Sequence, residues 1–337
     1  MTVRYRPIPQ SGTPRPPDAL PLAGGPLWFD RVAEHRRGAP PRFRAAADLP
    51  PEALAPLTAP RASVCGLALD RPRIMGILNV TPDSFSDGGL HATLPLAVAG
   101  AKALAEAGAD IVDIGGESTR PGADPVPVED EIARTAPVIA ALRAGGFALP
   151  ISIDTRNAAV AAAALDAGAD LFNDVSAMRH DPQSLVLAAG RGVPVCLMHA
   201  LGDPKTMQDA PAYDDVLLDV LDMLEGRIAA AEAAGIERAR ILVDPGLGFG
   251  KTVDHNLALV RGLAALHGLG CPILFGASRK RFIGTIGDAP LARERAPGSI
   301  ATALEALRQG AQVLRVHDVQ ETRQAVALWS ALNGDEQ

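Results

Sequence analysis

The sequence predicts an α/β protein: a (β/α)8 TIM barrel with an N-terminal hairpin and a Pro-rich N-terminal extension. From Ile74 onward one unit recurs, in which an alanine-rich helix ends at a glycine and an apolar strand follows at once. Eight such strands can be counted, with helical patterns between nearly all of them and few hairpin signals. That alternation is typical of a closed (β/α)8 barrel, and a doubly wound open sheet is the alternative.

The recurring unit is clearest at AGADIVDIG (107–115), AGADLFNDV (167–175) and GAQVLRVHD (310–318). A glycine at a helix C-terminus followed by an apolar strand is the signature of an αβ loop. After a small hairpin at 63–72, the predicted strands are 74–79, 110–114, 150–153, 170–173, 193–198, 240–243, 272–275 and 312–316. The clearest predicted helices are Leu94–Ala107, Glu129–Arg143, Asp214–Ala234 and Ser299–Arg308.

Residues 1–62 are predicted to be an extension of unknown role, in front of a barrel domain at 63–335. The extension holds 13 of the 29 prolines and shows no sustained strand or helix period. A short helix is expected around Leu27 to Arg36, where Trp28 and Phe29 would attach it to the barrel.

Composition argues against several classes of protein. No apolar run approaches the ~20 residues of a membrane span, and the N-terminus lacks the apolar core of a secretory signal. Cys65, Cys196 and Cys271 stand far apart and at no metal-ligand spacing, which favours a reducing cytoplasm. A net charge of −7 argues against nucleic acid as the main partner.

The stretch 73–89, RIMGILNVTPDSFSDGG, is predicted to form the lip of an active site. Its first half is a strand that ends at Asn79, and its second half is a loop that ends in two glycines. A loop that merely connects two elements needs neither a phenylalanine, Phe85, nor the two acids Asp83 and Asp87.

Barrel enzymes place their chemistry at the carboxyl ends of the strands, and here those ends are polar. One or two buried polar residues would be ordinary satisfied core groups. Eight polar strand ends that meet on one face would be hard to satisfy without a polar ligand. These residues are Asn79, Asp113, Asp154, Asn173, His199, Asp244, Ser278, and Arg315 with His317.

The types of these residues indicate the ligand. The acids and the amide, Asp154, Asn173 and Asp244, suit a ring edge with several N–H donors, as in a pterin or a purine. Arg315 can stack its guanidinium plane on such a ring. The candidates for a phosphate or metal–diphosphate end are Asn79, Arg120 and His317.

The stretch 277–283, ASRKRFI, predicts an anion site at the start of a helix. Ser278 is the expected N-cap, with Lys280 and Arg281 in the first turn. Cations there oppose the helix dipole, so a structural role does not explain them, whereas bound anionic groups would.

Two tempting motifs fail. The stretch GLGFGKT (246–252) resembles a P-loop, but the spacing of that motif would require glycine at Pro245. Lys251 is therefore expected to be a solvated loop residue. His199 has no second histidine at ligand spacing, so we expect a hydrogen-bonded wall residue and not a metal ligand. No arrangement of a protein nucleophile is readable, which favours a reaction that needs none.

Seven stretches, in order, resemble the dihydropteroate synthases of the folate pathway, over roughly residues 63–335. One departure falls after Met198-His199, where the family often has methionine-glutamine and this chain has Ala200-Leu201. The matching stretches are MGILNVTPDSFSDGG (75–89), DIGGESTRPGA (113–123), SIDT (152–155), FNDVSA (172–177), DPGLGFGK (244–251), GASRKRFIG (276–284) and RVHD (315–318).

The resemblance implies a transferase, a sulfonamide target in the cytoplasm, that works as a homodimer with Mg2+. Its reaction would join (7,8-dihydropterin-6-yl)methyl diphosphate and 4-aminobenzoate to give 7,8-dihydropteroate and diphosphate. Loss of the diphosphate, assisted by Mg2+, would leave a pterin cation that the arylamine attacks. Because the arylamine is neutral at pH 7, positioning would matter more than a strong base.

The resemblance also implies a role for each matching residue. The pterin would lie against Asp154, Asn173, Asp244, Lys280 and Arg315. The diphosphate would face Asn79, Arg120, Arg315 and His317, with Mg2+ near Asn79. The 4-aminobenzoate pocket would comprise Phe85, Arg120, Pro121, Phe249, Ser278, Lys280 and Arg281. The catalytic set would be Asp87, Lys280, Arg315 and His317, with Asp87 stabilising the pterin cation.

Three other functions remain open at this stage. A pterin-dependent methyltransferase would share the acids of the third, fourth and sixth strands but would not need the SRK and RVHD stretches. A non-catalytic pterin-binding barrel would keep the fold and lose residues of the loops. A barrel with an unrelated phosphate substrate requires the ordered motif match to be chance.

Overall fold

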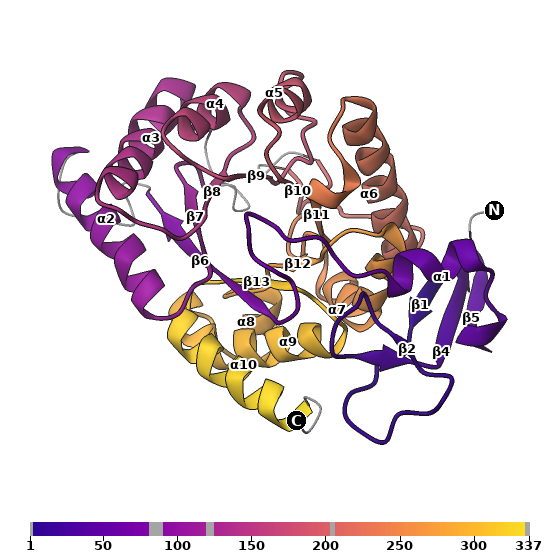
Figure 1. The fold of residues 1–337 in the computed structure, drawn as a ribbon. Helices are drawn as coiled ribbons and strands as arrows, with labels where there is room; N and C mark the ends of the chain where they lie inside the picture. Colours follow the sequence, from indigo (N-terminus) through magenta and orange to yellow (C-terminus); the bar gives the residue numbers. More distant parts are fainter. Residues whose placement is uncertain (1–2, 81–89, 119–124, 203–205, 334–337) are drawn as a thin grey trace.

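The computed structural model describes residues 3–80, 90–118, 125–202 and 206–333. Its centre is a parallel eight-stranded sheet in the order β11-β10-β9-β8-β7-β6-β13-β12 (Figure 1). A parallel bridge between Val243 and Ile273 joins the two ends of this order, so the sheet closes into a barrel and the open-sheet alternative is wrong. The strands are β6 (Arg73–Asn79), β7 (Ile111–Gly115), β8 (Ile151–Asp154), β9 (Leu171–Asp174), β10 (Val195–Met198), β11 (Ile241–Asp244), β12 (Leu274–Phe275) and β13 (Val313–Val316).

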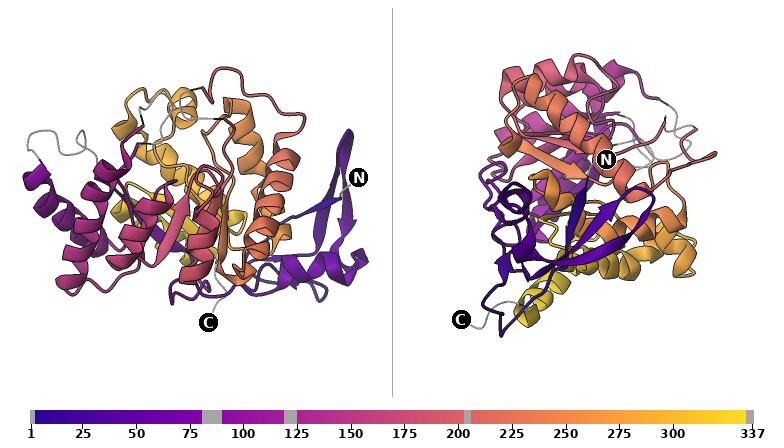
Figure 2. Two further views of the ribbon diagram at one scale, coloured as in Figure 1. Left: turned by 90° about the horizontal axis from the view of Figure 1, so that it is seen from above. Right: turned by 90° about the vertical axis from the view of Figure 1, so that its right-hand side faces the viewer.

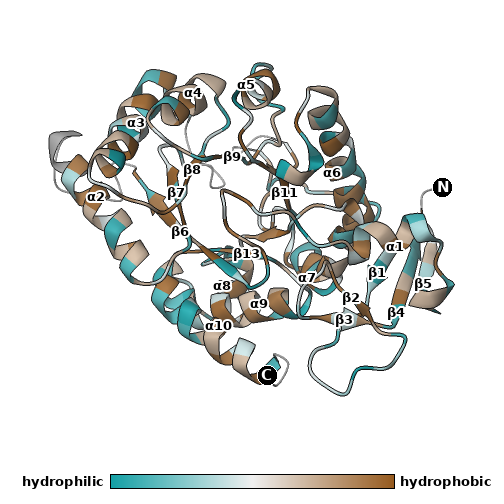
Figure 3. Cartoon of the chain, viewed as in Figure 1, coloured by the Kyte–Doolittle hydropathy of each residue, from teal (hydrophilic) through white to brown (hydrophobic). Residues whose placement is uncertain are grey.

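An outer ring of helices covers the strands, with apolar faces turned inward and polar faces outward (Figure 3). The predicted strands and helices are confirmed, with ends that shift by a few residues. Gly108, Gly168 and Gly310 have positive φ at the helix-to-strand turns, a conformation that glycine adopts without strain. The helices are α2 (Leu90–Glu106), α3 (Val128–Ala144), α4 (Ala158–Asp166), α5 (Ser184–Arg191), α6 (Val216–Ala233), α7 (Val253–Gly262), α8 (Arg281–Ile286), α9 (Ala296–Arg308) and α10 (Val319–Asn333), with 3-10 turns η3 (Arg238–Arg240), η4 (Leu263–Leu269) and η5 (Ala292–Arg295).

Among the described residues, no helix combines the length and the apolar character that crossing a membrane requires. The three cysteines form no disulfide.

The predicted hairpin at 63–72 is confirmed as a tight turn in which Val64 and Leu67 exchange backbone hydrogen bonds of 3.0 and 2.9 Å. Val64 packs into the amino-terminal end of the barrel and closes its floor. The side chains that it joins there come from seven of the strands: Met75, Ile111, Leu171, Cys196, Leu242, Leu274 and Val313.

The predicted helix at Leu27 to Arg36 is wrong, because this stretch forms strands. Trp28–Phe29 is β3, and Arg31–Arg36 is β4, the middle strand of an antiparallel sheet in the order β1-β4-β5. Val32 of β4 lies opposite residues on both neighbouring strands, so pairing with distant segments decides the conformation. The other elements of this part are β1 (Arg4–Pro7), β2 (Leu20–Pro21), β5 (Ala39–Ala45), η1 (Ala46–Asp48) and α1 (Pro51–Thr58).

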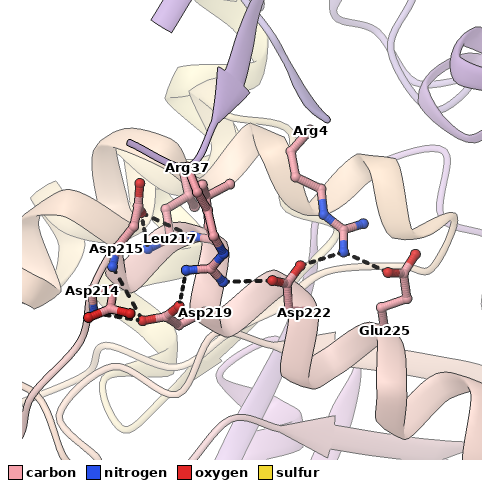
Figure 4. Close-up of polar contacts among 9 residues, drawn as sticks. Arg4, Arg37, Asp214, Asp215, Leu217, Asp219, Asp222 and Glu225 are labelled. Carbon is pink, nitrogen blue, oxygen red and sulfur yellow. Dashed lines mark hydrogen bonds and ion pairs between the residues drawn. The ribbon is translucent and has the colours of Figure 1, made fainter. Parts of the chain in front are cut away.

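This N-terminal sheet lies beside α6 and η4 on one side of the barrel (Figure 2). Arg4 and Arg37 reach across to the exposed face of α6, where Arg4 pairs with Asp222 and Glu225 at 2.7 and 2.6 Å (Figure 4). Arg37 pairs with Asp219 and Asp222 at 2.6 Å each. Because the acidic partners on α6 are 26–54% exposed, these ion pairs contribute little and apolar burial has to supply most of the attachment.

The expected anchoring is confirmed for Phe29, which is fully buried, whereas Trp28 donates its indole N–H to the carbonyl oxygen of Gly12 within the N-terminal part. Phe29 belongs to the same continuous apolar core as the barrel strands and the inner faces of their helices. The N-terminal part and the barrel therefore share one core.

We predict that Phe29→Ala lowers the free energy of unfolding by about 3–5 kcal/mol, because it leaves a cavity in this shared core. Urea unfolding followed by circular dichroism measures the loss. The matched control is Phe43→Ala on β5, where the side chain is 69% exposed and the change should stay within about 0.5 kcal/mol. Equal stabilities of the two variants would show that the N-terminal part does not share the core.

Candidate active site

The active-site layer lies one step above the apolar floor of the barrel. Side chains two residues apart on a strand point to the same face, so each strand that contributes to the floor presents its next inward residue at the mouth. On most strands this second residue is polar, as the sequence predicts for the strand ends. These mouth residues are Asp113 above Ile111, Asn173 above Leu171, Asp244 above Leu242 and Arg315 above Val313, together with Asp154 above the buried polar Ser152 of β8.

Arg315 stands at the centre of this layer. Its Nε donates to Oδ2 of Asp113 at 2.6 Å, and its Nη2 donates to Oδ2 of Asp154 at 2.6 Å. Asp113 is fully buried, whereas Arg315 is 21% exposed at the mouth. Asn173 extends the cluster, with its Nδ2 3.4 Å from both carboxylate oxygens of Asp113. The two acids raise the pKa of Arg315, which remains a cation in this cluster.

Asp154 offers a carboxylate oxygen to a ligand. Its Oδ2 is held by Arg315, while its Oδ1 is buried and has no hydrogen-bond partner among the described residues. Burial raises the pKa of Asp154 to about 7, against the opposing effect of Arg315. A buried acceptor without a donor is costly unless a bound molecule satisfies it.

Asp244 is positioned by the turn that follows β11. The carboxylate is 5% exposed, and its Oδ1 accepts a hydrogen bond of 2.7 Å from the backbone N–H of Gly246. Burial raises the pKa of Asp244, and the neighbouring Lys280 acts against the rise. Oδ1 of Asp244 is therefore held by the protein. The acid lies beside Lys280, which the sequence places in the same site.

Lys251 is buried, at 4% exposure, and the prediction of a solvated loop lysine is wrong. Its Nζ donates to the carbonyl oxygens of Gly246 at 2.8 Å and of Phe249 at 3.0 Å. It also lies 2.9 Å from Nδ1 of His199, which is the hydrogen-bonded wall residue that the sequence predicts. The correction has a plain cause, since a cluster of carbonyl oxygens receives the ammonium group in place of water.

Ser278 is not an N-cap, which corrects the second prediction for this region. Its Oγ accepts from the backbone N–H of His317 at 3.1 Å and lies 3.0 Å from Nδ1 of the same histidine. Helix α8 begins at Arg281, and Lys280 occupies the N-cap position without a side-chain capping bond. The helix starts later than predicted, and the serine hydroxyl instead accepts from the residue that follows β13.

Lys280 turns back from α8 over the loop after β11. Its Nζ donates to the carbonyl oxygen of Leu247 and lies 4.7 Å from the centre of the Phe249 ring. Burial lowers the pKa of Lys280 to about 8, and Asp244 acts in the opposite direction. The structure thus brings Lys280, Phe249 and Asp244 together, whereas Arg281 is exposed on α8.

Asn79 ends β6 and pairs in register with Gly115, which in turn pairs with Asp154. Gly115 brings no side chain between Asn79 and Asp154, and a Cβ there would lie 3.5 Å from Cβ of Asp154. The other four residues assigned from the sequence, namely Phe85, Asp87, Arg120 and Pro121, lie outside the described residues.

Two contacts of the site are not predicted by the sequence. Asp113 was noted as a polar strand end, but its place as the buried partner of Arg315 follows only from the opposed strands. Arg279, with φ of 58°, pairs with Asp318 through a hydrogen bond of 3.0 Å and ties the loop before α8 to the end of β13. In the loop that departs from the family pattern, the carbonyl oxygen of Ala200 accepts from Arg179 at 2.8 Å.

Comparison with known proteins identifies the class. Residues 75–317 match the family described as pterin binding enzyme, so this chain belongs to that family of barrel proteins. Within the family it belongs with the dihydropteroate synthases, as its resemblance in seven stretches implied. The dihydropteroate synthase of Escherichia coli (strain K12) is 48% identical over 265 residues, which cover 79% of this chain and 93% of that relative.

Solved structures agree with this family. The dihydropteroate synthase of Xanthomonas albilineans with 4-aminobenzoic acid is 52% identical, with a TM-score of 0.76 over 81% of this chain and 98% of that one. The same enzyme in complex with 7,8-dihydropteroate is 49% identical, with a TM-score of 0.73 over the same shares of the two chains. The dihydropteroate synthase of Yersinia pestis, solved with a sulfonamide drug complex, is 46% identical with a TM-score of 0.75, and covers 80% of this chain and 98% of that one.

Proposed function

We propose that this chain condenses (7,8-dihydropterin-6-yl)methyl diphosphate with 4-aminobenzoate to give 7,8-dihydropteroate and diphosphate. The observation that carries the proposal is the polar layer of the barrel mouth, where buried acids surround Arg315 and leave a carboxylate oxygen of Asp154 unsatisfied. A pterin edge supplies the several N–H donors that such a layer requires.

The pterin ring would lie on the floor of the mouth. Asp154 and Asp244 would accept its N–H groups, and Asn173 would meet a ring atom with its amide. Arg315 would offer one face of its guanidinium group to the ring, because its edge is already bound to Asp113 and Asp154.

The 4-aminobenzoate would lie nearer the rim, beside Phe249 and the turn at Ser278 to Arg281. The Phe249 ring and the stem of Lys280 supply apolar surface for an aromatic ring. Lys280 and Arg281 supply positive charge for its carboxylate. Lys280 also lies beside Asp244, where it would contact the pterin. This lysine would therefore stand between the two substrates.

The described residues fit a magnesium ion bound mainly through the substrate. They contain no group of three or more His, Cys, Asp or Glu side chains arranged to hold a metal. Mg2+ usually keeps several waters and takes one or two protein ligands besides substrate phosphates, which suits a single amide oxygen from Asn79. When bound, the ion would neutralise charge on the departing diphosphate, a task that His317 and Arg315 would share from β13.

The reaction replaces one bond at the methylene carbon of the pterin substrate: a C–O bond breaks and a C–N bond forms. The C–O bond between the methylene carbon and the diphosphate breaks, and its electron pair leaves with the diphosphate. The cation that remains is stabilised by the electron-rich dihydropterin and by the nearby carboxylates Asp154 and Asp244. The amine nitrogen then donates its lone pair to form the C–N bond and loses one proton. No side chain has to act as a nucleophile, and the barrel mouth serves to orient both partners.

We predict that the purified chain, given the dihydropterin diphosphate and Mg2+, releases diphosphate only when 4-aminobenzoate is present. Dihydropteroate should form in equal amount, measured by coupled diphosphate assay and chromatography. Asp244→Ala should abolish turnover while Asp18→Ala, at an exposed N-terminal position, should not. Tight pterin binding without turnover would favour the non-catalytic alternative, and transfer of a methyl group would favour the methyltransferase.

A second prediction concerns pH. Because burial lowers the pKa of Lys280 to about 8, the side chain is a cation below that pH and neutral above it. If its charge holds the substrates, kcat/KM should fall as pH rises through about 8, by up to ~10-fold per pH unit. Lys280→Arg, with a guanidinium that stays charged, should lose this alkaline limb in whatever activity it retains. A wild-type profile that is flat up to about pH 10 would contradict this role.

The proposal extends to a cytoplasmic homodimer. The support for the homodimer is an apolar strip on α10, where Leu328 and Leu332 lie one turn apart and are 62% and 75% exposed. We predict that sedimentation velocity finds about twice the chain mass of 34.9 kDa and that Leu332→Glu shifts the protein toward monomer. A wild-type monomer at micromolar concentration would count against the dimer, and a dimer that Leu332→Glu leaves intact would place the contact elsewhere.

A further inference from the structure

The segment Gly246–Gly250 has an unusual set of hydrogen bonds. It belongs to neither a helix nor a strand, yet each of its five carbonyl oxygens accepts from a side chain. The pairs are Gly246 with Lys251 at 2.8 Å, Leu247 with Lys280, Gly248 with Gln208 at 2.5 Å, Phe249 with Lys251 at 3.0 Å, and Gly250 with Tyr213 at 2.8 Å.

Backbone geometry makes the segment dependent on these bonds. Gly246, Gly248 and Gly250 all have positive φ, which other residues adopt only with strain. A Cβ on Gly246 would lie 1.8 Å from the carbonyl oxygen of His199, so the segment is pressed against the end of β10. Regular secondary structure does not hold this shape. One backbone bond of 3.2 Å, from Phe249 N–H to Gly246, lies within the segment, and most of its other polar contacts are with side chains.

Lys251 supplies two of the five bonds and also reaches His199. Its three short contacts, at 2.8, 2.9 and 3.0 Å, match the three N–H donors of an ammonium group. Burial lowers the pKa of Lys251 to about 7, and Lys280 adds to this effect while Asp244 opposes it. Burial also lowers the pKa of His199 to about 3, so its ring is neutral and can accept. Below a pH of about 7 Lys251 is an ammonium ion, and each of its three N–H groups has an acceptor.

The bonds of Lys251 lead to the proposed 4-aminobenzoate pocket. Phe249, whose carbonyl oxygen Lys251 holds, places its ring 4.7 Å from Nζ of Lys280. Leu247, which lies between the two carbonyls held by Lys251, provides the acceptor for that same Nζ. The pterin-facing side chains Asp154 and Asn173 have their partners Arg315 and Asp113 on other strands, whereas Asp244 accepts one hydrogen bond from Gly246 at the start of the segment.

We infer that Lys251 is a positioning residue, whose ammonium group holds the segment Gly246–Phe249 against His199 and thereby places Phe249 and Lys280 for the aromatic amine. The inference rests on the proposed function. Lys251 itself touches no substrate in this arrangement, because it lies beneath the segment with its three donors occupied by protein acceptors.

The test compares Lys251→Met with Lys102→Met, the same substitution at an exposed lysine. Per folded enzyme, Lys251→Met should raise the KM for 4-aminobenzoate by roughly ten- to a hundredfold, as expected when a binding group is displaced by about 1 Å. The KM for the dihydropterin diphosphate should rise by a smaller factor, because Asp154 and Asn173 are held by residues of other strands, and Lys102→Met should alter neither KM. Lys251→Gln, which keeps two donors on a shorter chain, should fall between wild type and Lys251→Met.

A merely structural lysine would give a different result. Lys251→Met would then lower the melting temperature while both KM values per folded enzyme stayed at the wild-type level, and this would overturn the inference. An equal rise in both KM values would overturn it as well. If Lys251→Met is insoluble, the shift in Lys251→Gln decides between the same outcomes.

Failure of the proposed function itself would be recognised separately, because the wild type would then show no turnover. In that case hydrogen exchange decides the inference. Faster exchange confined to peptides that contain Gly246–Gly250 in Lys251→Gln would support the positioning role. Exchange at the wild-type rate there would overturn it.

Discussion

The structure of the barrel mouth depends on the contact of the Arg315 guanidinium with two carboxylates, Asp113 and Asp154. Taking these charges out of water is costly, and a protein that needed only stability could have used apolar residues at the same positions. Here the pairing keeps two acids and one cation in a small space, with Arg315 partly exposed toward the mouth. The contact is best understood as the preparation of a binding surface, because it leaves Oδ1 of Asp154 without a donor among the described residues.

The rest of the barrel supports this contact through a division into two layers. The floor is apolar and plugged by Val64, and the mouth two residues further along the strands is polar. Because inward side chains recur at every second residue, a single register of eight parallel strands sets both layers at once. A shift of one residue in any strand would exchange a core residue for a residue of the site. The continuous apolar core outside the strands, shared with the N-terminal part, therefore also protects the geometry of the mouth.

The loops at the mouth are organised differently from the strands. After β11 the backbone is held by the long side chains of Lys251 and Lys280, and before α8 Arg279 pairs with the carboxylate of Asp318. Buried lysines whose donors are satisfied by carbonyl oxygens can set loop shape while remaining charged, although burial lowers their pKa. This arrangement combines a rigid base for the pterin with a rim for the second substrate that individual side chains control.

The sequence by itself determined the barrel and most of its polar layer. Alternation of alanine-rich helices and apolar strands is a local pattern, and the positive-φ glycines Gly108, Gly168 and Gly310 fall where that pattern ends each helix. Polar residues at strand ends were enough to find Asp154, Asn173, Asp244 and Arg315, because period two and the parallel sheet bring them to one face. Motif resemblance then indicated the family, which the comparisons confirmed.

Only the tertiary structure decided which partners each side chain meets. Arg31–Arg36 is a strand through pairing with β1 and β5. Lys251 is buried among carbonyl oxygens of a loop, and Ser278 bonds to His317 in place of a helix terminus. In each case the sequence shows the residue but not which distant residue contacts it. The reason is physical: hydrogen bonds and ion pairs act over a few ångströms between segments far apart in the chain, whereas propensity and periodicity report only on neighbours along it.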